Sequence, residues 1–230
     1  MINATMNELE QLFLSAEVAQ TRSICVTACH TQSGVSSIAS ALAERYLLAG
    51  YSTLLVDLNL LGSAYTPQPC LTAEDETEIQ WLQANDHQGI FTGITVAKTG
   101  PDVVSYRNPH YLSEKIQTWH RDFERIIIDT SPILDHSEGI IPAQSIARAC
   151  QHTLIVVQGG ETKQAQLVKA FELLKQADAN VLGCMLNNHN QATLGQEMVR
   201  ELNRCKFLPK SIRAKWSKKL LNNEWLSHIA

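Results

Sequence analysis

Residues 24–62 read ICVTACHTQSGVSSIASALAERYLLAGYSTLLVDLNLLG, and this stretch decides the fold. It begins with an apolar run at 24–28, passes through small and polar residues at 29–34, and continues from Ser36 into a segment of small and apolar residues. A second apolar run follows and ends in Asp57. The order strand, loop, helix, strand and carboxylate predicts a loop whose amides, together with the helix N-terminus, bind phosphate.

The loop departs at one position from the fingerprint of P-loop proteins, G-x-x-x-x-G-K-[ST]. Residues 29–36 keep the second glycine, Gly34, and the hydroxyl of Ser36, but place Val35 where the fingerprint has lysine. A valine can neither donate a hydrogen bond nor neutralise a phosphate. Because a charge-assisted hydrogen bond is worth roughly 1.5–3 kcal/mol, its loss weakens nucleotide binding by about ten- to a hundredfold. We therefore expect the loop to hold an anion without fast phosphoryl transfer.

The composition is that of an ordinary globular domain, with 230 residues, of which 44% are hydrophobic and 18% charged. There is no run of about 18 apolar residues, and residues 1–20 carry acids where a secretory signal has a basic flank. We expect a cytoplasmic chain without a spanning helix or signal peptide. The six cysteines contain no C-x-x-C pair, which favours reduced, buried thiols over a metal or redox site.

The net charge of −4 is unevenly distributed. Residues 196–230 contain eight Lys or Arg and three Glu, so they carry +5 and the remaining chain −9. A nucleic-acid-binding domain would be basic, so we expect no nucleic-acid partner. We divide the chain into a domain at 1–195 and a basic amphipathic helical tail at 196–230. The tail has three open roles: packing on its own domain, docking on a protein partner, or peripheral membrane contact through 208–229.

Apolar runs alternate with helical patterns along the chain, which predicts an α/β fold with a doubly wound, mainly parallel sheet flanked by helices. In such sheets ligands bind at the carboxyl ends of the strands. We also expect a short helix at 78–83 and a loop at 98–107. The main helices are expected at 6–18, 36–49, 109–119, 142–149 and 163–177, and the further strands at 94–97, 123–129, 153–157 and 181–186.

Five segments, in this order, resemble the P-loop partition ATPases of the Min and Par type. The resemblance is greatest to the cytoplasmic bacterial tyrosine-kinase domains that partner exopolysaccharide and capsule export proteins. It covers about residues 23–188. The segments are 28–36, 54–59, 94–100 with 108–112, 126–134, and 156–162 with 181–187.

The resemblance implies a site for ATP and magnesium. Ser36 would bind magnesium directly and Asp129 would hold it through water, while Asp57 would lie near the attacking group. Asn187 would contact the adenine. The amides facing the β- and γ-phosphates would be those of Gln32, Ser33, Gly34, Val35, Ser36 and Ser37.

Each of these residues also has a structural alternative. Asp57 and Asp129 could be polar strand ends that bond loop amides. Ser36 and Ser37 could cap the helix, and Asn187 could be a turn residue. His30 stands where the partition ATPases carry an extra lysine. It could supply a partial positive charge or be an exposed loop histidine.

Four departures from the family pattern bear on activity. Val35 replaces the loop lysine, Gln32 a glycine and Asn59 the second acid of a D-x-D pair, and residues 112–230 contain no tyrosine. The three substitutions affect charge neutralisation and positioning, which supply the rate of phosphoryl transfer, and the absence of tyrosine removes the residues that such kinases phosphorylate. Autophosphorylation of a terminal tyrosine cluster is therefore not expected.

These observations favour a catalytically impaired P-loop protein that regulates or scaffolds exopolysaccharide or capsule biosynthesis or export. The resemblance implies a polysaccharide export or synthase protein as partner, at the inner face of the membrane, and leaves a homodimer open. The alternative is an active magnesium-dependent ATPase in which His30 or a partner's arginine replaces the lost charge. A dinucleotide oxidoreductase fits worst, because no G-x-G-x-x-G follows the first strand.

Overall fold

The computed structural model describes residues 6–62, 64–68, 79–85, 89–96, 101–188, 194–204, 210–223 and 226. The chain forms two compact units. The first is Met1–Val157 with Thr162–Leu186, and the second is Gln158–Glu161 with Asn187–Ala230. Parts of the predicted helix at 78–83, loop at 98–107 and contact segment at 208–229 lie outside the described residues, at 78, 98–100, 208–209, 224–225 and 227–229.

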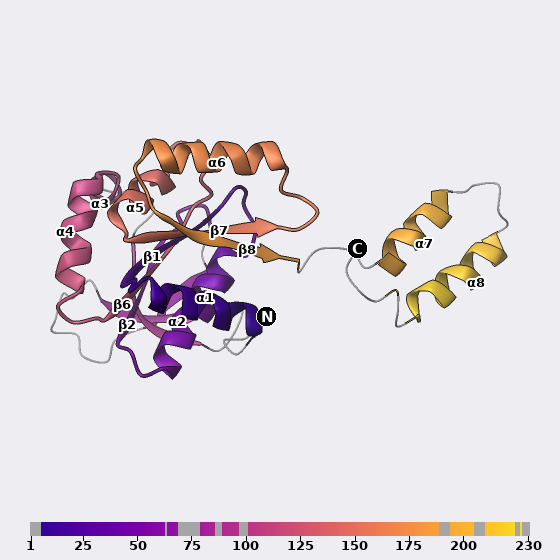
Figure 1. The fold of residues 1–230 in the computed structure, drawn as a ribbon, viewed down its shortest axis with the longest axis horizontal. Helices are drawn as coiled ribbons and strands as arrows, with labels where there is room; N and C mark the ends of the chain where they lie inside the picture. Colours follow the sequence, from indigo (N-terminus) through magenta and orange to yellow (C-terminus); the bar gives the residue numbers. More distant parts are fainter. Residues whose placement is uncertain are drawn as a thin grey trace. The chain divides into compact units, whose positions relative to one another are not determined.

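An eight-stranded sheet is built from the described part of the chain (Figure 1). The strands are β1 (Ser23–Ala28), β2 (Thr53–Leu58), β3 (Tyr65–Gln68), β4 (Gln80–Ala84), β5 (Ile90–Thr95), β6 (Arg125–Thr130), β7 (His152–Gln158) and β8 (Val181–Asn187). Their spatial order is β3-β4-β5-β2-β6-β1-β7-β8. The pairs of β1 with β6 and β7, and of β2 with β5 and β6, are parallel, whereas β4 pairs antiparallel with β3 and β5. The predicted fold class is confirmed.

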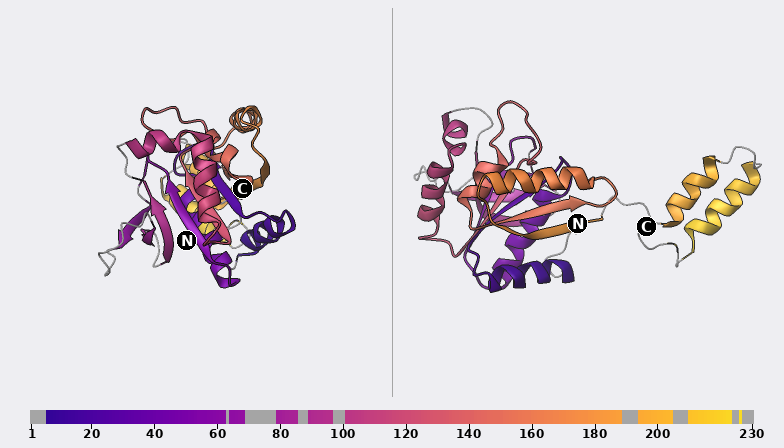
Figure 2. Two further views of the ribbon diagram at one scale, coloured as in Figure 1. Left: turned by 90° about the vertical axis from the view of Figure 1, so that its left-hand side faces the viewer. Right: turned by 45° about the horizontal axis from the view of Figure 1, so that its top comes forward.

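Helices cover both faces of the sheet (Figures 1 and 2). They are α1 (Asn7–Val18), α2 (Val35–Leu48), α3 (Pro101–Tyr106), α4 (Pro109–Trp119), α5 (Ala143–Ala149) and α6 (Gln164–Gln176). One buried apolar cluster contains residues of α1 and α2, and a second contains residues of α3 to α6. Because β1, β2 and most of β6 are buried on both faces, they are continuous apolar runs, as parallel strands between two helix layers require.

Two predictions for the middle of the chain were wrong. The short helix expected at 78–83 is strand β4, in which Leu82 and Ala84 are buried while Trp81 is exposed. This period-two pattern is stabilised by pairing with β5, where a Cβ on Gly93 would lie 2.4 Å from Leu82 Cδ1. The loop expected at 98–107 contains helix α3. Strand β3 was not predicted, and β5 begins before the predicted 94.

Three of the four described cysteines are buried, as predicted, and one is exposed. Cys25, Cys29 and Cys150 are buried free thiols, and Cys184 is free and exposed. Burial raises the pKa of Cys25 to about 12, which makes its thiolate inaccessible at neutral pH. No described group of three or more His, Cys, Asp or Glu could hold a metal ion by itself.

The second unit contains two helices that pack against each other, α7 (Leu194–Arg204) and α8 (Lys210–Leu221). The Arg213 guanidinium of α8 donates a hydrogen bond to the Asn203 carbonyl at 3.2 Å. Gly195 permits a close approach, since a Cβ there would lie 3.0 Å from the Leu220 carbonyl oxygen. None of the described helices is both long and apolar enough to cross a membrane.

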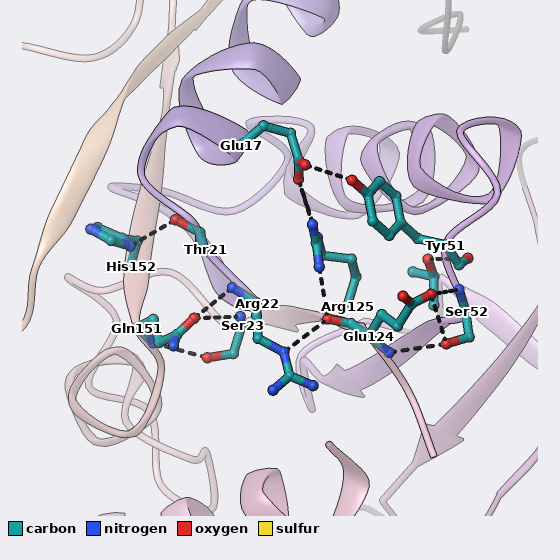
Figure 3. A network of polar contacts seen from close by, with 11 residues as sticks. Glu17, Thr21, Arg22, Ser23, Tyr51, Ser52, Glu124, Arg125, Gln151 and His152 are labelled. Carbon is teal, nitrogen blue, oxygen red and sulfur yellow. Dashed lines mark hydrogen bonds and ion pairs between the residues drawn. The ribbon is translucent and has the colours of Figure 1, made fainter. Parts of the chain in front are cut away.

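A polar network joins α1 to the amino ends of the strands (Figure 3). The Glu17 carboxylate accepts hydrogen bonds from Arg125 at 2.8 Å and from the Tyr51 hydroxyl at 2.7 Å. The Arg125 guanidinium also lies 4.0 Å from the centre of the Tyr51 ring. Burial opposes ionisation of Glu17, but the hydrogen bonds from Tyr51 and Arg125 outweigh it and lower the pKa of this carboxyl. The ionised form therefore stabilises the fold.

We predict that Glu17→Gln lowers the free energy of unfolding by about 1 kcal/mol near neutral pH. Because the native pKa of Glu17 is lowered, the wild-type advantage is present above the unfolded-state pKa and is lost as pH falls. Urea unfolding at about pH 7 and about pH 3.5 measures the difference. The matched control is Glu44→Gln on the exposed side of α2. An equal loss at both pH values for Glu17→Gln would contradict the assignment.

Candidate active site

The loop between β1 and α2 has a fixed backbone geometry. Gly34 adopts a left-handed conformation with φ of 90° immediately before α2, a conformation that glycine adopts without a steric penalty. Gln32 is also left-handed, with φ of 61°. The Ser33 hydroxyl donates to the His30 carbonyl at 2.9 Å, and Ile38 N–H donates to the Gly34 carbonyl at 3.0 Å. The loop is therefore shaped by its own hydrogen bonds.

A cavity of about 490 Å³ opens at this loop. The N-terminus of α2 lies at its wall, so backbone N–H groups and the positive end of the helix dipole favour an anion there. None of the described residues lining it is Lys or Arg. The lining residues are His30, Thr31, Gln32, Ser33, Gly34, Val35, Ser36, Ser37, Asn59, Leu61, Gly62, Thr130 and Pro132.

Two carboxylates lie side by side near the carboxyl ends of neighbouring strands. The register of β2 with β6 pairs Asp57 with Asp129. Asp57 is 8% exposed, and its Oδ1 accepts a hydrogen bond from Asn59 N–H at 3.0 Å. Asp129 is fully buried, and neither carboxylate oxygen makes a hydrogen bond within the described part of the chain. A buried carboxylate without partners is destabilising, and a bound cation would relieve that cost.

The pKa of Asp129 is raised well above its usual range, first by burial and then by the negative charge of Asp57. The hydroxyls of Ser36 and Tyr65 oppose the shift only in part, since neither makes a hydrogen bond of good geometry to it. Carboxylate and hydroxyl oxygens are hard ligands of the kind that Mg²⁺ prefers, with water and substrate phosphates completing its shell. Ser36 and Asp129 therefore fit a magnesium ion that arrives with a nucleotide, with the carboxylate of Asp57 beside Asp129.

Tyr65 is a site residue that the sequence did not indicate. Its hydroxyl donates to the Ser36 carbonyl at 3.0 Å, and the Ser40 hydroxyl donates to the same oxygen at 2.8 Å. Tyr65 is 2% exposed and comes from β3. Because β3 is a four-residue strand without an apolar run, no local pattern pointed to it.

The structure places the predicted phosphate-binding residues together. All six, from Gln32 to Ser37, line the cavity, and α2 is capped by Gly34, so neither Ser36 nor Ser37 is its N-cap. Val35 also belongs to the apolar core and is 7% exposed. Asn187 is the last residue of β8, where its carbonyl accepts from Gly159 N–H at 2.9 Å. It does not line the described cavity, so its contact with adenine stays a prediction.

Curated relatives of this chain are bacterial tyrosine-protein kinases. The tyrosine-protein kinase CpsD of Streptococcus agalactiae is 27% identical over 178 residues, which cover 74% of this chain and 75% of the relative. The putative tyrosine-protein kinase CapB of Staphylococcus aureus is 26% identical over 196 residues, covering 76% and 78%. The chain is related to the bacterial tyrosine-protein kinases. No protein-family model matches it.

Solved structures agree on the fold. The kinase domain of VpsO has a TM-score of 0.63 at 20% identity, covering 81% of this chain and 95% of that one. The kinase domain of the Escherichia coli tyrosine kinase ETK has a TM-score of 0.60 at 20% identity, covering 80% and 74%. The septum site-determining protein MinD of Pyrococcus horikoshii, solved with Mg-ADP, has a TM-score of 0.51 at 18% identity, covering 85% and 76%. The resemblance seen in the sequence is confirmed, and the fold is that of P-loop ATPases.

We predict that Asp129→Asn stabilises the protein near neutral pH without ligand, raising Tm by a few degrees. The raised pKa means that the native state binds a proton more tightly than the unfolded state, so the wild type loses stability as pH rises through the native pKa. The gain should shrink as pH falls toward about 4, because the wild-type carboxyl is then increasingly protonated in the unfolded state as well as in the native state. Thermal unfolding followed by circular dichroism measures it. A lower Tm for the variant at all pH values would contradict the unpaired state of Asp129.

Proposed function

We propose that this protein is a cytoplasmic P-loop domain that binds magnesium-ATP weakly and regulates or scaffolds capsule or exopolysaccharide biosynthesis or export. One observation carries the proposal. Residues 32–37 line the cavity at the loop, where their amides and the Ser36 hydroxyl would hold a magnesium-phosphate group, while Val35 takes the place of the loop lysine and no described lining residue is Lys or Arg. The pathway is inferred from the resemblance of five segments to the tyrosine-kinase domains of exopolysaccharide and capsule export. It is supported by the relatives CpsD and CapB, which are named as tyrosine-protein kinases.

The residues of the site would act in different ways on the nucleotide. The amides of residues 32–37 would contact its phosphates, and the Ser36 hydroxyl with Asp129 would hold magnesium. When bound, magnesium supplies charge neutralisation of the phosphates. Asp57 would orient the attacking group. Asn59, whose Oδ1 accepts from the Ser131 hydroxyl at 3.2 Å, stands where a second acid is expected and contributes no charge.

The partner in this proposal is a polysaccharide export or synthase protein at the inner face of the membrane. The basic unit formed by α7 and α8 is a candidate for its contact. The exposed residues Lys215, Lys218 and Lys219 on α8 can pair with an acidic partner or with anionic headgroups.

A second candidate function is an active ATPase with a non-standard phosphate loop. It is favoured by the position of His30, which lines the same cavity. A histidine can carry positive charge near neutral pH, although less constantly than lysine.

We predict that Val35→Lys increases the affinity for magnesium-ATP by about tenfold or more, because it adds one charge-assisted hydrogen bond at the phosphates. Isothermal titration calorimetry measures the dissociation constant, and phosphate release measures hydrolysis. Val35→Met is the matched control, because the methionine side chain is similar in length to lysine but carries no charge. Tight ATP binding with rapid hydrolysis by the wild type would overturn the proposed impairment, and no gain in Val35→Lys would contradict the alignment of the loop.

We also predict that a host strain lacking the gene makes less, or shorter, surface polysaccharide, and that Asp57→Asn restores it as well as the wild-type gene does. The reason is that a regulator needs its fold and its contacts, whereas an ATPase needs the carboxylate at the reacting group. Size and amount of extracted polysaccharide are measured at matched protein levels. Failure of a folded Asp57→Asn protein to complement would favour the ATPase instead.

A further inference from the structure

The cavity at the phosphate loop contains one side chain that can become a cation among its described lining residues. That side chain is His30, which is half-buried. Val35, at the lysine position, is part of the apolar core and cannot substitute. Among the described lining residues, only protonated His30 can therefore present a positive side chain to the phosphates.

The orientation of the His30 ring is fixed by α6. The His30 Nε2 atom lies 3.1 Å from Gln166 Oε1. The same Oε1 accepts a hydrogen bond from Lys163 N–H at 2.9 Å. A backbone N–H can only donate, so the Gln166 atom that both groups contact is the oxygen. His30 Nε2 must therefore carry a hydrogen and donate it.

This assignment decides where a second proton binds. In neutral His30 the hydrogen is on Nε2, and Nδ1 carries the lone pair. Protonation at Nδ1 makes the ring a cation and leaves the hydrogen bond to Gln166 intact. The ring can gain its charge without losing its position at the cavity.

We propose that His30 is the conditional cation of this phosphate loop: binding of a nucleoside triphosphate is coupled to uptake of a proton at His30 Nδ1. The inference rests on the proposed nucleotide site and adds its regulation. Phosphates near the ring favour the imidazolium form, and the imidazolium in turn strengthens phosphate binding. The protein binds triphosphate more tightly as pH falls through the range in which histidine ordinarily changes charge.

Other titratable and charged groups surround His30. Cys29 precedes it in the loop and interacts with Cys184 of β8. Burial raises the pKa of both thiols, so both are neutral in this range. Lys163 and the N-terminus of α6 are the positive groups on the Gln166 side of the ring. Asp57 and Asp129 lie at the ends of β2 and β6, and the pKa of Asp129 is raised by burial and by the charge of Asp57, so the pair carries less than its full negative charge. The phosphates of the ligand supply the charge that changes on binding.

The test is titration of ATP into the full chain at about pH 6 and about pH 8, in two buffers of different ionisation enthalpy. ATP is used with magnesium and, in a second series, with EDTA. In the EDTA series, protonation of Asp129 no longer weakens magnesium binding at low pH. Any effect of Asp129 on phosphate repulsion persists in His30→Gln, which separates it from protonation of His30. We expect about tenfold tighter binding at the lower pH, and a buffer-dependent enthalpy that reports proton uptake.

Three variants separate the possible causes. His30→Gln should keep only the pH dependence that comes from ATP itself and from Asp129, and His30→Lys should bind tightly at both pH values. His136→Gln, an exposed histidine that does not line this cavity, is the control and should behave as wild type. ATP binding with no pH dependence, unchanged in His30→Gln, overturns the role of His30 and leaves the nucleotide site standing. No ATP binding by wild type or His30→Lys, with native circular dichroism spectra, overturns the nucleotide site as well.

Discussion

The parallel pairing of β6 with β2 on one side and β1 on the other is the constraint on which the site depends. Parallel neighbours end at the same edge of a sheet, so this pairing brings Asp57, Asp129 and the loop after β1 to one place. The backbone after β6 is also tied to β1, because Ile133 N–H donates to the Ala28 carbonyl at 2.8 Å. A register shift of one residue would turn Asp129 into the opposite apolar layer. The carboxylates are thus positioned by the core and not by the loop.

The charges of the site are unbalanced. Two carboxylates lie side by side at the ends of β2 and β6. Burial of Asp129 without a hydrogen-bond partner among the described residues costs part of a stability that totals only about 5–15 kcal/mol in typical domains. A buried apolar residue would pack at this position without that cost. The buried Asp129 carboxyl is therefore better explained as a ligand for a cation than as a packing residue. The corresponding positive group for the phosphates is absent at Val35. A magnesium-nucleotide would therefore find carboxylates for its metal ion but no lysine for its phosphates.

The sequence predicted the parts of the fold that depend on local pattern. The continuous apolar runs of β1, β2 and β6 and the loop glycine Gly34 were recognised in the sequence, and they located the cavity. The parts that depend on distant partners were not. The Gln80–Ala84 strand is held by its neighbours, and Tyr65 reaches Ser36 only because β3 pairs with β4. The contact of His30 with Gln166 joins residues 136 positions apart, so no local pattern could predict the orientation of the histidine ring.

The shape of the loop does not depend on a lysine at position 35. Gly34 keeps its left-handed conformation, the Ser33 hydroxyl closes the turn onto the His30 carbonyl, and the first turn of α2 is fixed by two hydroxyls that bond the Ser36 carbonyl. None of these contacts uses the side chain of residue 35. The Val35 side chain instead packs into the apolar core, and this packing helps to hold the first turn of α2 in place. A loop that is already ordered loses little further entropy when a phosphate binds. Under the proposal made for His30, charge controls the affinity of this loop for phosphate, and one proton on the neighbouring ring is enough to change that affinity.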